Sequence, residues 1–165
     1  MGRTADYTRE RCAIAATMEI VGDPWTLLIL RDAFRGVKRF EQFQEGLGVA
    51  RNVLAARLKS LVAHGVMRTR PYSERPPRHE YVLTAKGRDL SPVLLTLSEW
   101  GDQHVYGAGQ GPVRFAHKSC GHAFHPRLAC EACGEVIGGR DLVRVARDDL
   151  SPTVGEALEQ AAKVG

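Results

Sequence analysis

The sequence predicts a mainly α-helical fold with one small β-hairpin, followed by a small, β-rich appendage. Three observations support this fold class. Apolar residues recur at helical spacing between capping residues over the first two thirds of the chain. Two short β-prone runs flank a proline-rich loop near residue 75. A glycine-rich linker at 107–112 then precedes a stretch rich in cysteine and histidine.

Capping residues and helix breakers define the first three helices. We expect them at residues 12–21, 25–34 and 40–45. Asp23 is a good N-cap, and Pro24 follows it at the first helical position, where proline is tolerated. Gly22 and Gly36 end the first two helices, and a Gly-Leu-Gly turn follows the third. These assignments depend more on caps and breakers than on helix propensity.

The fourth helix, at about 50–64, has two different faces. One face must pack on the core, because it carries Leu54, Leu58, Leu61 and Val62. The opposite face is small or polar and carries Asn52, Ala56, Lys59, Ser60 and Ala63. Because that face has no bulky hydrophobe, it is free to enter a groove. Gly65 ends the helix.

Two short strands are expected at 66–70 and 79–83, joined by a loop at 71–78. Pro71, Pro76 and Pro77 lie in this loop, and we expect them not to continue the strand ladder. The pattern describes a β-hairpin with a stiff tip that is made basic by Arg75 and Arg78.

Thr84 is a cap for a fifth helix that reaches about His104. Its apolar stripe, interrupted only by Pro92, consists of Leu90, Val93, Leu94, Leu97 and Trp100. A helix this apolar at the end of a small domain needs a partner. The expected domains are 8–106, then 113–150, and a tail or short helix at 151–165.

Composition and charge narrow the class of protein. The chain has 165 residues, 44% hydrophobic and 25% charged, as expected for a globular protein with one core and a small appendage. It has no long apolar run, and residues 1–10 are polar, so we expect a cytoplasmic protein without a membrane partner. Residues 51–80 contain 7 Lys or Arg against 2 Asp or Glu. Such an excess suits a polyanion, although a solvated basic face would look the same.

This order of elements is typical of a winged helix-turn-helix domain, in which one helix enters the DNA major groove and hairpin arginines reach phosphates or the minor groove. The chain also resembles the HxlR-type winged-helix regulators over about residues 10–104. The resemblance is carried by the stretches 21–30, 39–43, 54–61 and 81–87. Cys12 with its helix, Gly65, Pro76-Pro77 and Trp100 match as well. The resemblance implies a homodimer that binds double-stranded DNA as a repressor or activator, paired through its first and last helices.

The candidate DNA contacts are Arg39, Arg51, Asn52, Lys59, Arg70, Arg75 and Arg78. Asn52 has an alternative role as a cap at the helix start, and any single wing arginine has the alternative of idle surface. Arg57 lies beside the buried face, which favours a structural ion pair. Ala50 departs from the family, which usually has a capping hydroxyl residue there, at a cost of about 1 kcal/mol.

Cys12 is a candidate redox residue. It lies where members of the resembled family often carry a cysteine, which some of them use to sense oxidants or electrophiles. The alternative is a small buried hydrophobe at a helical interface. The predicted winged-helix core holds no second cysteine, so sensing would need the other subunit, a small thiol or alkylation.

The second cysteine signal predicts a zinc-ribbon-like module. Cys130-Glu-Ala-Cys133-Gly has the spacing of a zinc knuckle, and His117-Lys-Ser-Cys120-Gly repeats it with histidine first. Together, His117, Cys120, Cys130 and Cys133 would hold one structural Zn²⁺. His122 and His125 are alternatives to His117. Free or disulfide-bonded cysteines, another metal or a cluster are the competing interpretations.

Other functions are less well supported by the motifs. A zinc deaminase needs His-x-Glu and Pro-Cys-x-x-Cys, but Ala123-Phe124 follow His122 and Ala129 precedes Cys130. The βαβ context of a thioredoxin-like motif is missing as well, so we expect no enzyme. Two alternatives within regulation remain: a zinc module that binds another protein, and a regulator responsive to a small molecule or an electrophile.

Overall fold

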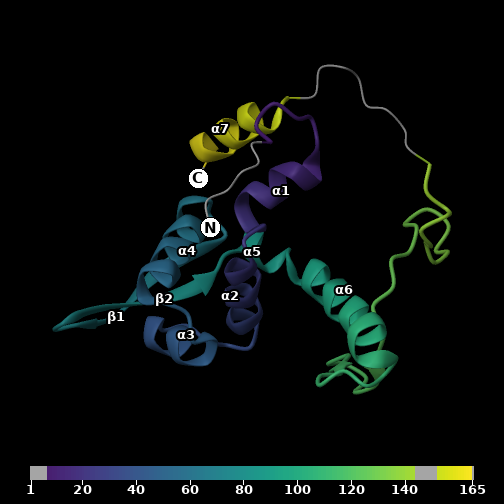
Figure 1. Ribbon diagram of the computed structural model, residues 1–165, viewed down its shortest axis with the longest axis horizontal. Helices are drawn as coiled ribbons and strands as arrows, with labels where there is room; N and C mark the ends of the chain where they lie inside the picture. Colours follow the sequence, from purple (N-terminus) through teal and green to yellow (C-terminus); the bar gives the residue numbers. More distant parts are fainter. Residues whose placement is uncertain (1–6, 144–151, 165) are drawn as a thin grey trace. The chain divides into compact units, whose positions relative to one another are not determined.

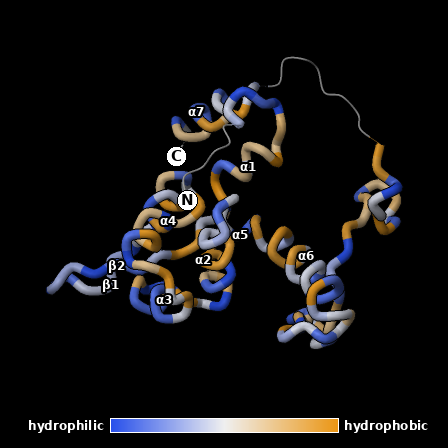
Figure 2. The backbone as a smooth tube through the Cα atoms, viewed as in Figure 1, coloured by the Kyte–Doolittle hydropathy of each residue, from blue (hydrophilic) through white to orange (hydrophobic). Residues whose placement is uncertain are grey.

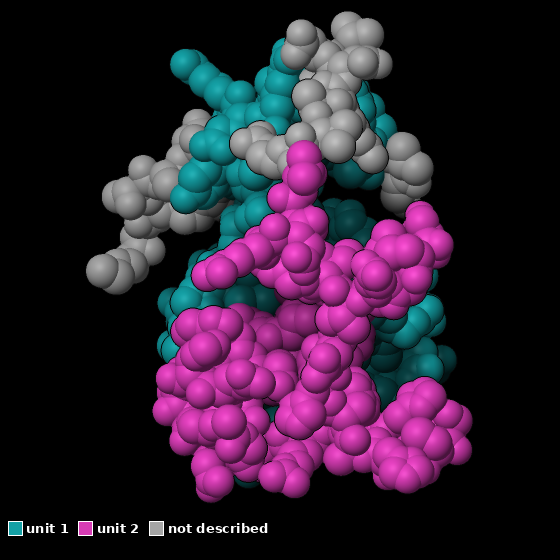
Figure 3. Space-filling model, turned by 90° about the vertical axis from the view of Figure 1, so that its right-hand side faces the viewer, with its two compact units in different colours: residues 1–89, 147–165 teal, residues 90–146 magenta. Residues whose placement is uncertain are grey.

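The computed structural model describes residues 7–143 and 152–164 (Figure 1). The chain forms two units, coloured separately in Figure 3: unit 1 comprises residues 1–89 and 147–165, and unit 2 comprises residues 90–146. Unit 2 is therefore an insertion in unit 1. Residues 144–150 of the expected zinc-ribbon region, and 151 and 165 of the expected tail, lie outside the described residues.

From residue 7 onward, four helices precede the hairpin in unit 1. They are α1 (Ala13–Val21), α2 (Pro24–Phe34), α3 (Phe40–Leu47) and α4 (Arg51–Ala63). The expected cap is present, because the Asp23 carboxylate accepts a hydrogen bond from the Trp25 amide at 3.0 Å. The Gln42 side chain accepts from the Arg39 amide at 3.1 Å and so supports the start of α3. Gly48, with φ of 63°, ends α3 in the left-handed conformation and redirects the chain into α4.

The core of unit 1 lies between these helices and the base of the hairpin. Its largest fully buried side chains include Phe43, Ile29, Leu30, Leu54, Leu58, Leu61, Met67 and Val66. The predicted inward face of α4 is confirmed for Leu54, Leu58 and Leu61, which are all 0% exposed, whereas Val62 is half-buried. Deleting one such leucine typically costs about 2–5 kcal/mol, so the orientation of α4 is strongly fixed.

The C-terminus of α4 turns directly into the hairpin. The Gly65 amide donates to the Val62 carbonyl at 3.0 Å, and the Val66 amide donates to the Leu61 carbonyl at 2.9 Å. With φ of 65° at Gly65, this is a Schellman motif, which satisfies the last carbonyls of the helix.

The hairpin is longer than the sequence predicts. Strands β1 (Met67–Glu74) and β2 (Pro77–Leu83) pair antiparallel almost to the tip. The expectation that the prolines interrupt the ladder is wrong for Pro71, which lies opposite His79, and for Pro77, which lies opposite Glu74, whereas Pro76 lies in the turn as expected. The register shifts between Pro71 and Ser73, and this bulge absorbs the irregularity. A two-stranded ribbon also has two free edges, where a missing amide is tolerated.

Thr84 closes the hairpin onto the helical core. Its hydroxyl donates to the Gly65 carbonyl at 2.6 Å and accepts from the Gly87 amide at 3.1 Å, which caps the short helix α5 (Ala85–Arg88). Gly87 is buried, and a Cβ atom at this position would collide with the backbone carbonyl of Val66. Glycine is thus required for the close approach.

The predicted fifth helix is not continuous. After α5, a new helix α6 (Ser91–Gly101) begins with proline in its first turn and leads into a π-helical segment η1 (Asp102–Gly107). Pro92 has no amide hydrogen, and its ring would clash with the carbonyl four residues earlier in a continuous helix. It therefore starts α6 rather than interrupting a longer helix. Val93, Leu97 and Trp100 of the predicted stripe are 48%, 50% and 59% exposed.

The end of the chain returns to unit 1. The predicted C-terminal helix is present as α7 (Val154–Val164), which packs on α1. The Val154 amide donates to the Glu10 carbonyl at 2.6 Å, and the Gly155 amide donates to the Thr8 carbonyl at 2.8 Å. Val154 is only 2% exposed. The segment before α1 and the start of α7 thus meet within one unit.

Unit 2 has little regular structure after η1. Strands β3 (Phe115–Ala116) and β4 (Ala123–Phe124) form a minimal hairpin. None of its described residues, 90–143, is buried. No single helix among the described residues is long and apolar enough to cross a membrane, although α1 and α2, bent by 79° at their junction, pass that test together.

Replacing Gly87 by alanine should destabilise the protein by about 1–3 kcal/mol, because the new methyl group would force the α5 turn away from Val66. The measurement is the urea midpoint of unfolding. Gly46→Ala is the matched control, since that helical position meets only the Asp32 carboxylate, at 3.9 Å. Equal midpoints for the two variants would contradict the close-approach argument.

Candidate nucleic-acid interface

The outward face of α4 is exposed and consists mainly of small side chains. Asn52, Ala56, Lys59 and Ala63 are all exposed, and at 100° per residue they fall within about 60° of the helix circumference. Ser60, predicted on the same face, is half-buried, and the Nδ1 atom of His64 lies 3.5 Å from its hydroxyl. The face therefore combines small side chains with one amide and one ammonium group.

The N-terminus of α4 starts without a side-chain cap. Ala50 is the N-cap residue, and no side chain caps the helix from that position. The alternative role of Asn52 as the cap is therefore wrong, since Asn52 lies within the first turn and is exposed. Amides at an uncapped helix start remain suitable donors for an anion such as a phosphate.

Arg51 connects α4 to α3. Its Nη1 donates to the Gln44 Oε1 at 2.7 Å, and its guanidinium lies 4.9 Å from the centre of the Phe40 ring. The residue is exposed nevertheless. These contacts restrict its rotamers, so its charge is held at the junction between the two helices.

Glu80 organises the base of the hairpin. Its carboxylate lies 2.8 Å from the Arg70 Nη2 and 3.8 Å from the Arg39 Nε. The hydrogen bond from Arg70, together with the charges of Arg70, Lys38 and Arg39, holds the pKa of Glu80 below its ordinary value. The carboxylate therefore stays ionised as the pH falls, and its ion pairs are lost only when the pH drops through that lowered pKa.

The bulge in β1 gives Arg39 a second contact. Tyr72 is the residue skipped by the ladder between Pro71 and Ser73, and the Arg39 guanidinium lies 4.4 Å from the centre of its ring. Arg39, Tyr72, Glu80 and Arg70 thus form one polar cluster, named here the Glu80 cluster.

The hairpin tip differs from its base. Arg75 and Arg78 are exposed, and neither forms an ion pair with any part of the chain that the structure describes. The hairpin projects from the α3–α4 pair in Figure 1, and it is mainly hydrophilic in Figure 2. Of the predicted contacts, Arg39 and Arg70 are partly neutralised by Glu80, whereas Arg75 and Arg78 keep their full charge.

Arg57 lies 3.4 Å from the Asp23 carboxylate, so the predicted structural ion pair is confirmed. Asp23 also caps α2, and one side chain therefore fixes both helices. The sequence reasoning missed Glu80 and Tyr72. Pairing across the two strands could have indicated Glu80, because Arg70 lies opposite it. The predicted loop at 71–78 hid this pair, since it would place Arg70 opposite His79.

Cys12 is exposed at the N-cap position of α1. It is therefore not buried within its own chain. All four cysteines are free thiols.

The predicted zinc ligands form two separate local pairs. The Nδ1 of His117 lies 3.4 Å from the Sγ of Cys120. Hydrogen bonds from the Cys133 and Ala132 amides, and a further one with the Cys133 side chain, lower the pKa of the Cys130 thiol. Among the described residues, no three His, Cys, Asp or Glu side chains lie close enough to hold one metal ion.

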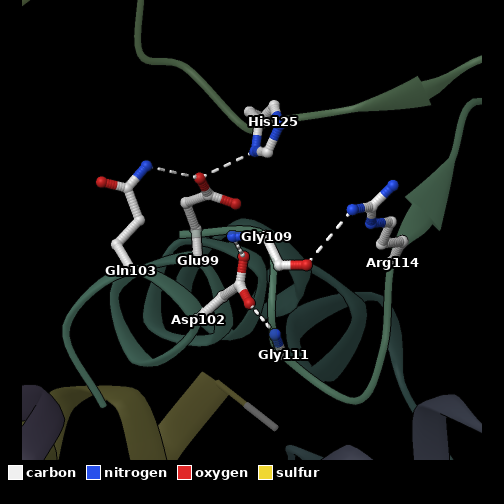
Figure 4. A network of polar contacts seen from close by, with 7 residues as sticks. All are labelled: Glu99, Asp102, Gln103, Gly109, Gly111, Arg114 and His125. Atoms are coloured by element: carbon white, nitrogen blue, oxygen red, sulfur yellow. Dashed lines mark hydrogen bonds and ion pairs between the residues drawn. The ribbon is translucent and has the colours of Figure 1, made fainter. Parts of the chain in front are cut away.

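The alternative ligand His125 has another partner, and the glycine-rich linker is structured (Figure 4). The Nδ1 of His125 lies 2.8 Å from the Glu99 carboxylate, which also accepts from Gln103 at 3.1 Å. The Asp102 carboxylate accepts from the Gly109 amide at 3.1 Å and from the Gly111 amide. The predicted flexible linker is therefore attached to η1 within unit 2.

Comparison with known proteins agrees with this architecture. The family model described as HxlR-like helix-turn-helix matches residues 20–108. An uncharacterized HTH-type transcriptional regulator of Mycobacterium tuberculosis is 44% identical over 130 residues, which are 79% of this chain and 82% of that protein.

Two solved structures are informative. PA1607, a proposed transcription factor, aligns with a TM-score of 0.73 and 39% identity over 83% of this chain and 95% of that chain. The redox regulator HypR in its reduced form aligns with a TM-score of 0.53 and 30% identity over 57% of this chain and 96% of that chain. The exposed α4 face, the hairpin and these matches agree, and the chain belongs to the HxlR-like helix-turn-helix family of transcriptional regulators.

Proposed function

We propose that the protein is a homodimeric repressor that binds specific DNA sequences with α4 and the hairpin of each subunit. The observation that carries this proposal is the exposed face of α4, which has Asn52 and Lys59 among alanines. It lies in the same unit as a hairpin whose two tip arginines have no ion-pair partner among the described residues.

The roles of these groups follow from their chemistry. An α-helix fits the major groove, where an asparagine amide can pair with adenine and a lysine with guanine. Small residues such as Ala56 and Ala63 allow the helix backbone to approach the base edges. Arg75 and Arg78 supply charge to phosphates or to the minor groove beside the site, which adds affinity for any sequence.

The exposed apolar residues support the homodimer. On α6 and η1 they are Val93, Leu97, Trp100, Val105 and Tyr106, and on α1 they are Ile14 and Met18. A second copy of the chain that covered these helices would remove this apolar area from water, and two recognition helices would then read two half-sites.

Oxidation of Cys12 is a second candidate function, as a signal that releases DNA. It is favoured by the exposure of Cys12 and by the similarity to HypR, which is known in reduced and oxidised forms. An exposed thiol is open to diamide or a quinone, and α1 belongs to the proposed dimer surface, so modification there can change the pairing.

Replacing both Arg75 and Arg78 by alanine should weaken binding to every DNA sequence, and the slope of log affinity against log salt should fall by about one per lost phosphate contact. Asn52→Ala should instead change sequence preference, by about 1–3 kcal/mol at the contacted base pair. Fluorescence anisotropy with an operator and a scrambled duplex measures both effects.

Glu80→Gln extends the same experiment, because it should raise affinity for both duplexes by releasing Arg39 and Arg70 from their pairs. Glu159→Gln, on the exposed side of α7, is the charge-matched control. Unchanged affinity, preference and salt slope in the arginine and Asn52 variants would refute the proposed interface.

Leu97→Glu should convert the dimer into monomers, because it places a charge in the apolar surface of α6. Ser98→Glu adds the same charge at a neighbouring exposed position that is not apolar. This control should leave the dimer intact. Sedimentation velocity distinguishes the two. A wild-type protein that sediments as a monomer would rule out the homodimer.

Diamide should release DNA from the wild-type protein but not from Cys12→Ser, while both reduced proteins bind equally. The readout is the anisotropy of labelled DNA before and after treatment with diamide, followed by dithiothreitol. If Cys12→Ser released DNA at the wild-type rate, Cys12 would be rejected as the sensor. The thiols of unit 2 would then be responsible for the release.

A further inference from the structure

We propose that the turns at 117–122 and 130–135 are two halves of one structural zinc site, with His117, Cys120, Cys130 and Cys133 as its ligands. This inference concerns unit 2 and is independent of the DNA interface. It rests on the equivalence of the two turns, which the ligand spacing alone does not establish.

The two turns have the same backbone hydrogen bonds. In the first, the His117 amide donates to the His122 carbonyl at 2.9 Å, and the Gly121 amide donates to the His117 carbonyl at 2.7 Å. In the second, the Cys130 amide donates to the Glu135 carbonyl, and the Gly134 amide donates to the Cys130 carbonyl, both at 2.8 Å. Two turns that differ in sequence thus have one geometry.

The glycines and the flanking strands match as well. Gly121 and Gly134 have φ values of 73° and 76°, in the left-handed region that favours glycine. Each turn closes a minimal antiparallel pair, with Ala116 opposite Ala123 around the first turn and Ala129 opposite Val136 around the second. In both turns, the residue just before the first ligand pairs with the residue just after the turn. Two short hairpins with ligands at their tips are the parts of a zinc ribbon.

This equivalence selects the fourth ligand. His117 corresponds to Cys130 and Cys120 to Cys133, whereas His122 corresponds to Glu135. His125 is paired with Glu99. The 3.4 Å between the His117 Nδ1 and the Cys120 Sγ also agrees with the separation of about 3.5 Å that Zn–N and Zn–S bonds give at a tetrahedral centre. His117 is thus already placed to share an ion with Cys120.

Unit 2 needs such a centre, because none of its described residues is buried. Phe115, Phe124, Leu128 and Val136 flank the turns and are 38%, 38%, 62% and 54% exposed. A segment this small has too little apolar core to hold its own fold, and a structural metal is the usual replacement.

The two turns must close on each other to complete the site. Among the described residues, no three candidate ligands lie close enough together to hold one metal ion. Only residues 123–129 separate the two turns, so the second can fold onto the first. Binding would deprotonate the three cysteine thiols and release their protons to solvent. The centre would then hold one Zn²⁺, three thiolates and one neutral imidazole.

Metal analysis of the full-length protein, purified under reducing conditions without chelators, tests the site. We expect about one zinc per chain, and a loss of most of it in Cys130→Ser and in His117→Ala. His122→Ala and His125→Ala are the matched histidine controls and should keep the wild-type content. Circular dichroism of each variant confirms that the helices of unit 1 remain folded.

Cobalt substitution provides a second readout that does not depend on DNA binding. Co²⁺ in the proposed site should show the visible bands of a tetrahedral ion and a thiolate charge-transfer band, and Cys133→Ser should lose most of both, as Cys130→Ser loses zinc. Background zinc in the wild-type protein, or full zinc in Cys130→Ser, would overturn the site. Metal lost from His122→Ala but retained by His117→Ala would overturn the assignment of His117.

Discussion

The burial of one side of α4 determines what the other side presents. Leu54, Leu58 and Leu61 are completely removed from water, and rotating the helix about its axis would expose them. The position of Asn52 and Lys59 on the outer surface is therefore a consequence of core packing. The Arg57–Asp23 ion pair restrains the middle of the same helix, and the Schellman turn at Gly65 fixes its C-terminal end. The proposed reading of base sequence depends on such a fixed surface, since a helix free to rotate would average its contacts.

The hairpin combines neutralised and free charge. Glu80 engages two arginines at the base, where they stabilise the packing of the hairpin against α3, and the tip retains two arginines without an acidic partner among the described residues. This separation places the net positive charge at the end of the hairpin that extends farthest from the core. In the proposed DNA complex, the phosphate backbone would meet a charge that requires no ion pair to be broken first. The bulge at Tyr72 contributes to the same arrangement by bringing an aromatic ring to Arg39.

Local patterns in the sequence predicted the helices, the inward face of α4 and the Arg57 ion pair, because each depends on residues a few positions apart or on a single core. They failed where a distant group decides the outcome. The hairpin register depends on a bulge that residue propensities do not predict. The Glu80 cluster depends in turn on that register. Pro92 was recognised as an irregularity, but its effect was underestimated, since it starts a separate helix. The two Cys/His turns could be predicted from spacing alone, whereas the equivalence of their hydrogen bonds required coordinates.

The return of α7 to α1 turns the intervening chain into a closed loop. Hydrogen bonds from Val154 and Gly155 to the segment before α1 hold the chain after the insertion on unit 1, and the chain before the insertion leaves unit 1 directly after α5. The entropic cost of closing such a loop rises with the logarithm of its flexible length, by about 0.6 kcal/mol for each doubling. Any ligand that holds two points of unit 2 together shortens the loop to be closed and so strengthens the docking of α7, by a few tenths of a kcal/mol. The order of the insertion and the packing beside Cys12 are thus thermodynamically linked through chain connectivity, with no contact between the two units required.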